Sequence, residues 1–233
     1  MNVLGLITAR GGSKGIPRKN LAPCGGEPLL YWTCKAARDA RCLSRTVIST
    51  DDAEIAEYAR SQGVEVPFMR PAELSSDTAT SIGVAQHAIT SLGEDGWATD
   101  IVVLLQPTSP LRTGVHLDEA FAQLRDGLDA VVSIIPVPHR FAPWNVMRLE
   151  GDLLRDYDTS EQPFERTRRQ GQPVLYARNG PVVIVTRAPV IMRASFYGER
   201  CAPYHMTPRD SVDIDDADDL AWADFLLRRR GGG

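Results

Sequence analysis

Residues 3–20, which read VLGLITARGGSKGIPRKN, join a short apolar run to a loop with three glycines and four cations. The apolar residues 3–8 predict a buried strand. In the loop that follows, glycines let backbone N–H groups approach an anion closely, and Lys and Arg supply the countercharge. Open α/β sheets bind ligands at the carboxyl ends of their parallel strands. The segment therefore predicts a phosphate-bearing ligand held by residues 10–20.

The loop does not match the two commonest phosphate-binding patterns. It lacks G-x-x-x-x-G-K-[ST], which disfavours a Walker NTPase, and G-x-G-x-x-G, which disfavours a dinucleotide site. A solvated basic loop that uses its glycines only for turns is the alternative interpretation.

Composition indicates an ordinary globular chain and restricts its partners. The chain has 233 residues, 43% hydrophobic residues and a net charge of −4, values typical of one folded domain. A slightly acidic protein has no general attraction for nucleic acid or anionic membrane. The four cysteines form no C-x-x-C pair, which favours reduced thiols and a cytoplasmic protein. We find no signal peptide and no apolar run long enough to span a membrane.

Strand and helix patterns alternate along the chain. Strands are predicted at 3–8, 46–50 and 64–68, with helices between them, and this βαβαβ unit implies a parallel sheet. The run 101–105 is apolar on both faces and predicts a central strand. Later strands are predicted at 130–135, 182–185 and 212–215, and later helices near 80–90, 115–125 and 217–228. We expect one domain over 1–233, with an insertion at about 136–172 that contains a hairpin around Gly151.

Two carboxylates near the carboxyl terminus suggest a metal site. Asp213 and Asp215 are two residues apart on the predicted strand 212–215, so both would face one side of it. A hard cation such as Mg²⁺ binds one or two carboxylates together with phosphate oxygens. The alternative is capping of the next helix, which we assign to Asp216, Asp218 and Asp219.

Seven sequence blocks, in order along nearly the whole chain, give a family resemblance. They are residues 9–20 (ARGGSKGIPRKN), 70–74 (RPAEL), 76–78 (SDT), 104–112 (LLQPTSPLR), 168–170 (RRQ), 176–180 (YARNG) and 213–215 (DID). The sequence resembles the acylneuraminate cytidylyltransferase family, of the CMP-sialic acid synthetase type. The resemblance implies a Rossmann-like three-layer αβα sandwich with a mainly parallel sheet. It also implies a homodimer made partly by the inserted hairpin, and Mg²⁺-dependent transfer of CMP from CTP to an acidic sugar with release of pyrophosphate.

The resemblance also implies roles for individual residues. Catalytic roles fall on Arg10, Lys19, Asp213 and Asp215, of which the two aspartates would bind Mg²⁺. Nucleotide contacts fall on Arg10, Gly11, Gly12, Ser13, Lys14, Lys19, Asn20, Arg70, Ala79 and Ser81. Acceptor contacts fall on Gln106, Arg169 and Asn179.

The acceptor half of the site departs from the sialic-acid pattern. Sialic-acid-specific members carry an Arg and a Tyr where this chain has Ala177 and Val183, and an arginine follows instead at Arg178. The lysine that they place in the insertion is replaced around Pro143 and Trp144. The acceptor is therefore left open among a nonulosonic acid, a phosphonate, a sugar phosphate and an amino variant of an acidic sugar. A nucleotide-binding module without catalysis is the alternative from another class.

Overall fold

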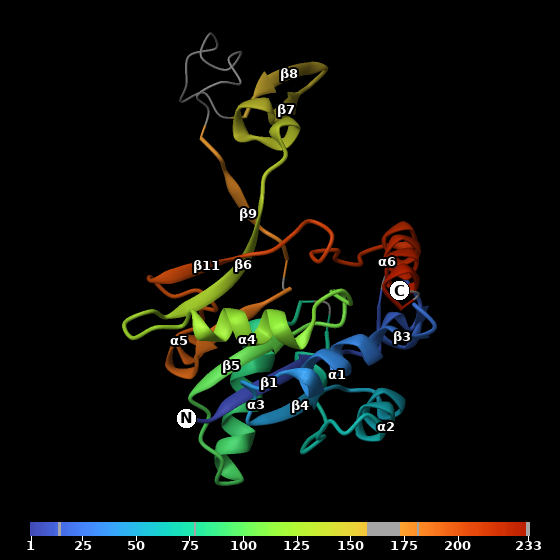
Figure 1. The fold of residues 1–233 in the computed structure, drawn as a ribbon, viewed down its shortest axis with the longest axis vertical. Helices are drawn as coiled ribbons and strands as arrows, with labels where there is room; N and C mark the ends of the chain where they lie inside the picture. Colours follow the sequence, from blue (N-terminus) through green and yellow to red (C-terminus); the bar gives the residue numbers. More distant parts are fainter. Residues whose placement is uncertain (14, 77, 158–172, 181, 232–233) are drawn as a thin grey trace.

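The computed structural model describes residues 1–13, 15–76, 78–157, 173–180 and 182–231 (Figure 1). Its centre is a seven-stranded sheet in which β11, β6, β10, β5, β1 and β4 lie side by side in that order, while β9 pairs with β6. The strands are β1 (Val3–Thr8), β4 (Arg45–Ser49), β5 (Ile101–Leu105), β6 (Ala130–Pro136), β9 (Tyr176–Arg178), β10 (Ile184–Arg187) and β11 (Cys201–His205).

The sheet is mainly parallel. β1 pairs in parallel with β4 and β5, and β11 pairs in parallel with β6. β10 runs antiparallel between β5 and β6, and β9 is also antiparallel to β6. β1, β4, β5 and β6 therefore end at the same edge of the sheet, where a ligand is expected.

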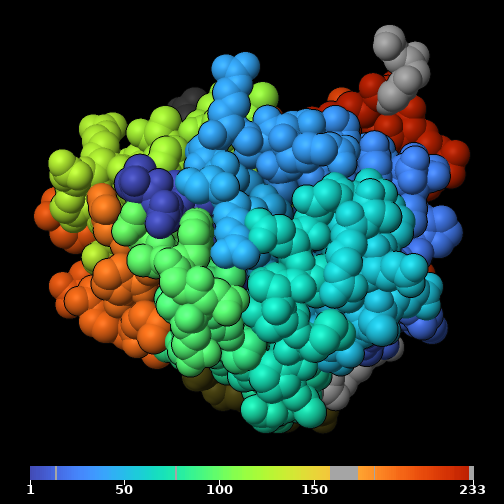
Figure 2. Space-filling model, turned by 90° about the horizontal axis from the view of Figure 1, so that it is seen from below, coloured from blue at the N-terminus to red at the C-terminus, as the bar shows by residue number. Residues whose placement is uncertain are grey.

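Helices cover both faces of the sheet, because the side chains of its central strands alternate between two apolar clusters. In β5, Ile101, Val103 and Leu105 belong to one cluster, and Val102 and Leu104 belong to the other. The first cluster receives α1 (Leu29–Asp39), α2 (Ala53–Ser61) and α4 (Gly114–Ala122), and the second receives α3 (Ser81–Glu94) and α5 (Ala188–Met192). From the end opposite the inserted arm, Figure 2 shows the segments of α3 (green) and α5 (orange) side by side. The expected Rossmann-like α/β sandwich is confirmed.

Two predicted strands are wrong. Residues 64–68 form only an isolated bridge, between Val47 and Glu65. Residues 212–215 form no strand; the segment is a loop in which the Ile214 N–H donates to the Thr108 carbonyl (2.9 Å). α6 (Ala217–Gly231) follows this loop. The sequence patterns did not predict α5, β11 or the short pair β2 (Pro23–Cys24) and β3 (Glu27–Pro28).

The insertion leaves the sheet as an arm (Figure 1). β7 (Met147–Glu150) and β8 (Leu153–Asp156) form a separate two-stranded sheet around Gly151, as predicted. The arm continues from β6, so it starts at the edge where β1 and β5 also end. The last part of the predicted insertion, residues 158–172, lies outside the described residues.

Candidate active site

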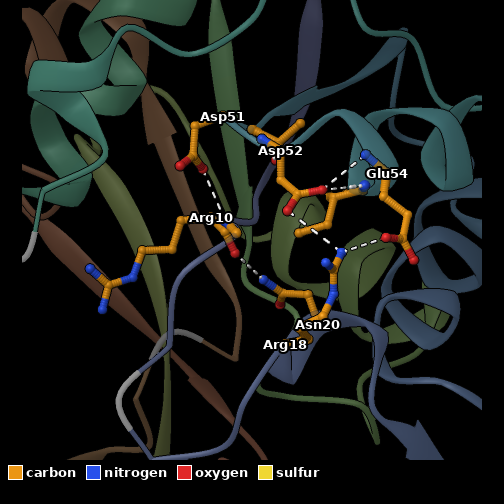
Figure 3. A network of polar contacts seen from close by, with 9 residues as sticks. Arg10, Arg18, Asn20, Asp51, Asp52 and Glu54 are labelled. Atoms are coloured by element: carbon orange, nitrogen blue, oxygen red, sulfur yellow. Dashed lines mark hydrogen bonds and ion pairs between the residues drawn. The ribbon is translucent and has the colours of Figure 1, made fainter.

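The glycine loop is fixed against the end of β4. The Gly11 N–H donates to Oδ1 of Asp51 (2.9 Å), and a side chain at Gly11 would come within 2.9 Å of the Cβ of Asp52. Only glycine permits this approach. Asp52 also caps α2 through the N–H groups of Glu54 and Ile55. Figure 3 shows the Arg10 side chain directed away from these carboxylates.

Arg18 points toward α2, although its position in the loop suggested a phosphate contact. It has a left-handed backbone (φ 51°). Its guanidinium pairs with Glu54 (2.8 Å) and Asp52 (3.6 Å) at the start of α2 (Figure 3). Arg18 therefore attaches the end of the loop to α2.

Lys19 and Asn20 point in the other direction, toward Ile214 and Arg10. Nδ2 of Asn20 donates to the Arg10 carbonyl (2.8 Å), which fixes the two ends of the loop together (Figure 3). Nζ of Lys19 donates to the Ile214 carbonyl (2.7 Å). The ammonium group of Lys19 thus lies at the backbone between Asp213 and Asp215.

The loop and the end of β5 enclose one continuous cleft. A cavity of about 260 Å³ adjoins a cavity of about 160 Å³, and both are lined by Thr8, Arg10 and Gln106. The remaining predicted residues that line the first are Arg70, Ala79 and Ser81, and those that line the second are Gly12, Ser13, Lys19 and Asn20. Lys14 lies outside the described residues.

Arg70 is built rigidly into the first cavity. Its side chain is buried, and its Nε and Nη2 donate to the hydroxyl and carbonyl oxygens of Ser49. Burial lowers the pKa of this guanidinium, and the nearby Asp51 partly offsets that shift. A guanidinium stays charged despite such a shift. Arg70 can therefore offer a fixed cation and fixed donors to a ligand.

Asp213 and Asp215 face the glycine loop from the segment before α6. The Gly15 backbone packs against Asp215, because a side chain there would lie 2.6 Å from the Asp215 carbonyl oxygen. Asp213 is partly buried and Asp215 is exposed. Burial raises the pKa of Asp213, although a hydrogen bond from Thr108 opposes the rise. Oδ1 of Asp213 has no hydrogen-bond partner among the described residues.

Helix capping is performed by other aspartates. Asp216 accepts from the N–H groups of Asp218 and Asp219 at the start of α6. Asp219 accepts from those of Asp215 and Asp216. The Asp213 side chain takes no part in these caps. Capping therefore accounts for Asp216 and Asp219, and it does not account for the partly buried carboxylate of Asp213.

A magnesium ion would find suitable but incomplete ligands here. Carboxylate oxygens suit Mg²⁺, which completes its shell with water and phosphate. Within the described part of the chain, no group of three His, Cys, Asp or Glu side chains could hold a metal. Asp213 and Asp215 could therefore supply at most a partial shell, which is the arrangement expected where substrate phosphates provide the remaining ligands.

The predicted acceptor residues have different surroundings. Gln106 lines both cavities, and its Nε2 donates to Oγ of Ser81 (3.4 Å). Asn179 is only 6% exposed; it accepts from Ser133 and donates to Ser211, at 2.6 Å each. Its neighbour Gly180 packs on Asp213, because a side chain there would lie 2.8 Å from Oδ2. Arg169 lies outside the described residues.

The positions that depart from the sialic-acid pattern face different environments. Val183 is buried in the core, so its side chain cannot contact an acceptor. Ala177 is exposed on β9. The Arg178 guanidinium stacks over the Tyr197 ring, 4.3 Å from its centroid. Thr8, which lines both cavities, and Thr108, which is hydrogen-bonded to Asp213, were not among the predicted site residues. The available signals were the position of Thr8 at the end of β1 and the place of Thr108 in the block 104–112.

A glycine-rich cationic loop lines a cleft at the carboxyl edge of an α/β sheet and contacts the segment that carries Asp213 and Asp215, an arrangement expected of a nucleotidyltransferase. Residues 4–207 match the family model described as Cytidylyltransferase, and the chain belongs to this family.

The relatives agree with this assignment. The chain is 33% identical over 215 residues to an N-acylneuraminate cytidylyltransferase of Oncorhynchus mykiss, a match that covers 92% of this chain and 48% of the relative. It is 30% identical to a CMP-N,N'-diacetyllegionaminic acid synthase of Legionella pneumophila, over 97% of both chains. The chain thus spans about half the length of the first relative and nearly all of the second.

A solved structure shares the fold. A CMP:2-keto-3-deoxy-manno-octonic acid synthetase complexed with CTP superimposes with a TM-score of 0.72 at 15% identity, over 99% of this chain and 100% of that chain.

In the described residues, no helix is long and apolar enough to cross a membrane.

Proposed function

We propose that this protein transfers CMP from CTP to a hydroxyl group of an acidic, nonulosonic-type sugar and releases pyrophosphate. The observation that supports this most strongly is the contact between Lys19 and the Ile214 carbonyl. This contact brings the glycine loop to Asp213 and Asp215, the acidic pair. The family is defined by cytidylyl transfer, and relatives named for neuraminic and legionaminic acids match most of the chain.

The two cavities divide the parts of CTP between them. In this proposal the cytosine and ribose occupy the cavity lined by Arg70, Ala79 and Ser81, because the guanidinium N–H groups of Arg70 that Ser49 does not accept can donate to the edge of a pyrimidine. The triphosphate lies along Gly12, Ser13 and Lys19 in the second cavity. Bound Mg²⁺, held by Asp213 and Asp215, would neutralise phosphate charge in the transition state.

The transfer itself needs positioning more than covalent chemistry. The acceptor oxygen bonds to the α-phosphorus, the bond from that phosphorus to the bridging oxygen breaks, and pyrophosphate leaves with its electron pair. The hydroxyl proton passes to solvent. Charge on the phosphate oxygens grows near Arg10 and Lys19, and fixed cations stabilise such a state strongly. Gln106, which lines both cavities, is placed to contact the acceptor.

A matrix of donors and acceptors tests this function. Pyrophosphate release is measured with CTP, UTP, ATP and GTP against N-acetylneuraminate, N,N'-diacetyllegionaminate, 2-keto-3-deoxy-manno-octonate, a phosphonate and a sugar phosphate. We expect release only with CTP, Mg²⁺ and a nonulosonic acid. If only a phosphonate or only a sugar phosphate supports release, that compound class replaces the nonulosonic acid as the proposed acceptor. CTP binding without turnover on any acid would favour a non-catalytic module.

Gly12→Ala tests whether a ligand occupies the space over the loop. A side chain at Gly12 meets nothing within 4 Å, so the melting temperature should stay unchanged. If the phosphates lie there, the added methyl group should weaken CTP binding by about tenfold, or about 1.4 kcal/mol, as measured by calorimetry. Gly93→Ala, at another glycine with nothing within 4 Å, is the control and should leave CTP affinity unchanged. Equal affinity in both variants would remove Gly12 from the binding site.

We also propose that the arm forms a homodimer. Leu149 and Leu154 lie opposite each other on β7 and β8 and are 74% and 63% exposed. Leu153, Tyr157 and Val174 are also more than half exposed nearby. Apolar patches of this kind on a projecting element mark protein interfaces.

Replacing Leu149 by Lys together with Leu154 by Glu should convert the dimer to a monomer. The two new charges face each other across the hairpin and attract, so the hairpin itself should persist. The measurement is molar mass by light scattering after gel filtration. Val115→Lys, at an exposed apolar residue of α4 far along the chain from the arm, is the control. A dimeric double variant would contradict the assignment of the interface to the arm.

A further inference from the structure

Arg112 is a buried cation without an ion-pair partner among the described residues. It lies between β5 and α4 and is 2% exposed. Its Nη1 donates to the Val182 carbonyl (2.9 Å), and its Nη2 donates to the Thr33 hydroxyl (2.9 Å) and the Gln106 carbonyl (3.0 Å). Its Nε has no hydrogen-bond partner in the described part of the chain.

Such a group is expensive for the fold. An unpaired charge loses its hydration on burial, and hydrogen bonds to neutral groups recover only part of that cost. Burial lowers the pKa of Arg112 to about 10, and the one charged group that opposes the shift is Asp213. Stability alone would favour an uncharged residue at this position, so the charge requires another explanation.

Two of the backbone groups that Arg112 holds lead to the candidate site, while its third partner, Thr33, belongs to α1. Gln106, whose carbonyl Arg112 holds, lines both cavities with its side chain. Val182 follows the Asn179–Gly180 turn, in which Gly180 packs on Asp213. One guanidinium therefore connects the backbone of Gln106, which lines the cleft, to the segment whose Gly180 packs on Asp213.

We propose that Arg112 is a positioning residue for the transfer step. It fixes the Gln106 backbone relative to the Asp213 segment and supplies positive potential near Asp213. This inference rests on the proposed function, since it assigns Gln106 to the acceptor. Arg112 is not a CTP ligand in this scheme, so its loss should affect acceptor turnover more than CTP binding.

Arg112→Met and Arg112→Lys test the role. Methionine removes the charge, whereas lysine keeps it but cannot donate to both carbonyls in the fork geometry. We expect kcat/KM for the acceptor to fall about 100-fold in Arg112→Met, the effect of a displacement of about 1 Å, and by less in Arg112→Lys. Arg112 does not contact CTP in this scheme. The dissociation constant of CTP, measured without Mg²⁺, should therefore change by less than about threefold, or about 0.7 kcal/mol. If Arg112→Met does not fold, Arg112→Lys decides the test.

Arg187→Met is the matched control. Arg187 also holds backbone carbonyls, those of Leu128 and Arg125, but at the other end of β10. It should change the melting temperature without changing the ratio of acceptor turnover to CTP affinity.

A double-mutant cycle separates positioning from general stability. If Arg112 acts through Gln106, Arg112→Lys should have little further effect on acceptor KM in a Gln106→Ala background. Three results would each overturn the role. They are additive losses in the cycle, a parallel fall in CTP affinity, turnover and melting temperature, and wild-type kinetics in both Arg112 variants. An active wild type with such results overturns this inference alone, whereas a wild type inactive on every acid overturns the proposed function as well.

Discussion

Lys19→Ala is expected to lower kcat/KM for cytidylyl transfer by about 100- to 1,000-fold, the loss typical of one preorganised contact to developing charge. The Lys19 ammonium is held by the Ile214 carbonyl at 2.7 Å and lines the cavity assigned to the triphosphate. Because it joins the glycine loop to the segment of Asp213 and Asp215, its loss should remove a contact that belongs to this position. Single-turnover measurements with saturating CTP would separate the chemical step from binding.

Arg18→Gln is the control, because it changes the adjacent cation of the same loop. Arg18 pairs with Glu54 and Asp52 at the surface (Figure 3), and exposed ion pairs contribute about 1 kcal/mol at most. Its turnover should stay within about twofold of wild type, which corresponds to less than 1 kcal/mol in the barrier. Equal losses in the two variants would mean that the loop acts only through its net charge.

The central strands could be predicted because their sequences leave few alternatives. Residues 101–105 are apolar at every position, and β5 is buried on both faces. The segments 64–68 and 212–215 have equally plausible patterns, yet each makes only isolated backbone contacts. The sequence does not specify which strand lies beside a short segment or how many ladder hydrogen bonds the two will form, so neither outcome could be predicted. The same reason explains why the antiparallel direction of β10 was not foreseen.

The site was predictable where a residue acts through its own chemistry. Arg10, Gly12, Lys19 and Arg70 all line the cleft, although the role of each stays a prediction. The direction in which each side chain points was not predictable, because it depends on contacts between segments far apart in the chain. Arg18 turns to α2 and Arg112 turns into the core, yet both are simply cations of conspicuous motifs in the sequence.

Asp213→Asn should nearly abolish transfer while making the folded protein more stable. Asparagine has almost the same shape but no charge, so it should lose several kcal/mol of metal-assisted stabilisation, or about 1,000-fold in kcat. Burial raises the pKa of Asp213 above its ordinary value of 3.8, so the ionised carboxylate opposes folding. That penalty is absent below the unfolded pKa and complete above the folded pKa. Without divalent cations, the variant should melt at a higher temperature than wild type at pH 7.5, and the difference should shrink toward pH 4.

Asp216→Asn shows whether this pairing of effects is specific to Asp213. Asp216 caps α6, and asparagine is an equally good cap, so both turnover and melting temperature should remain close to wild type. A stabilised Asp213→Asn with full activity would show that the buried charge has no catalytic purpose. An inactive but destabilised variant would show that the carboxylate holds the segment in place through its hydrogen bond with Thr108. Only the combination of lost activity and gained stability fits a charge retained, against the preference of the fold, for a cation that arrives with the nucleotide.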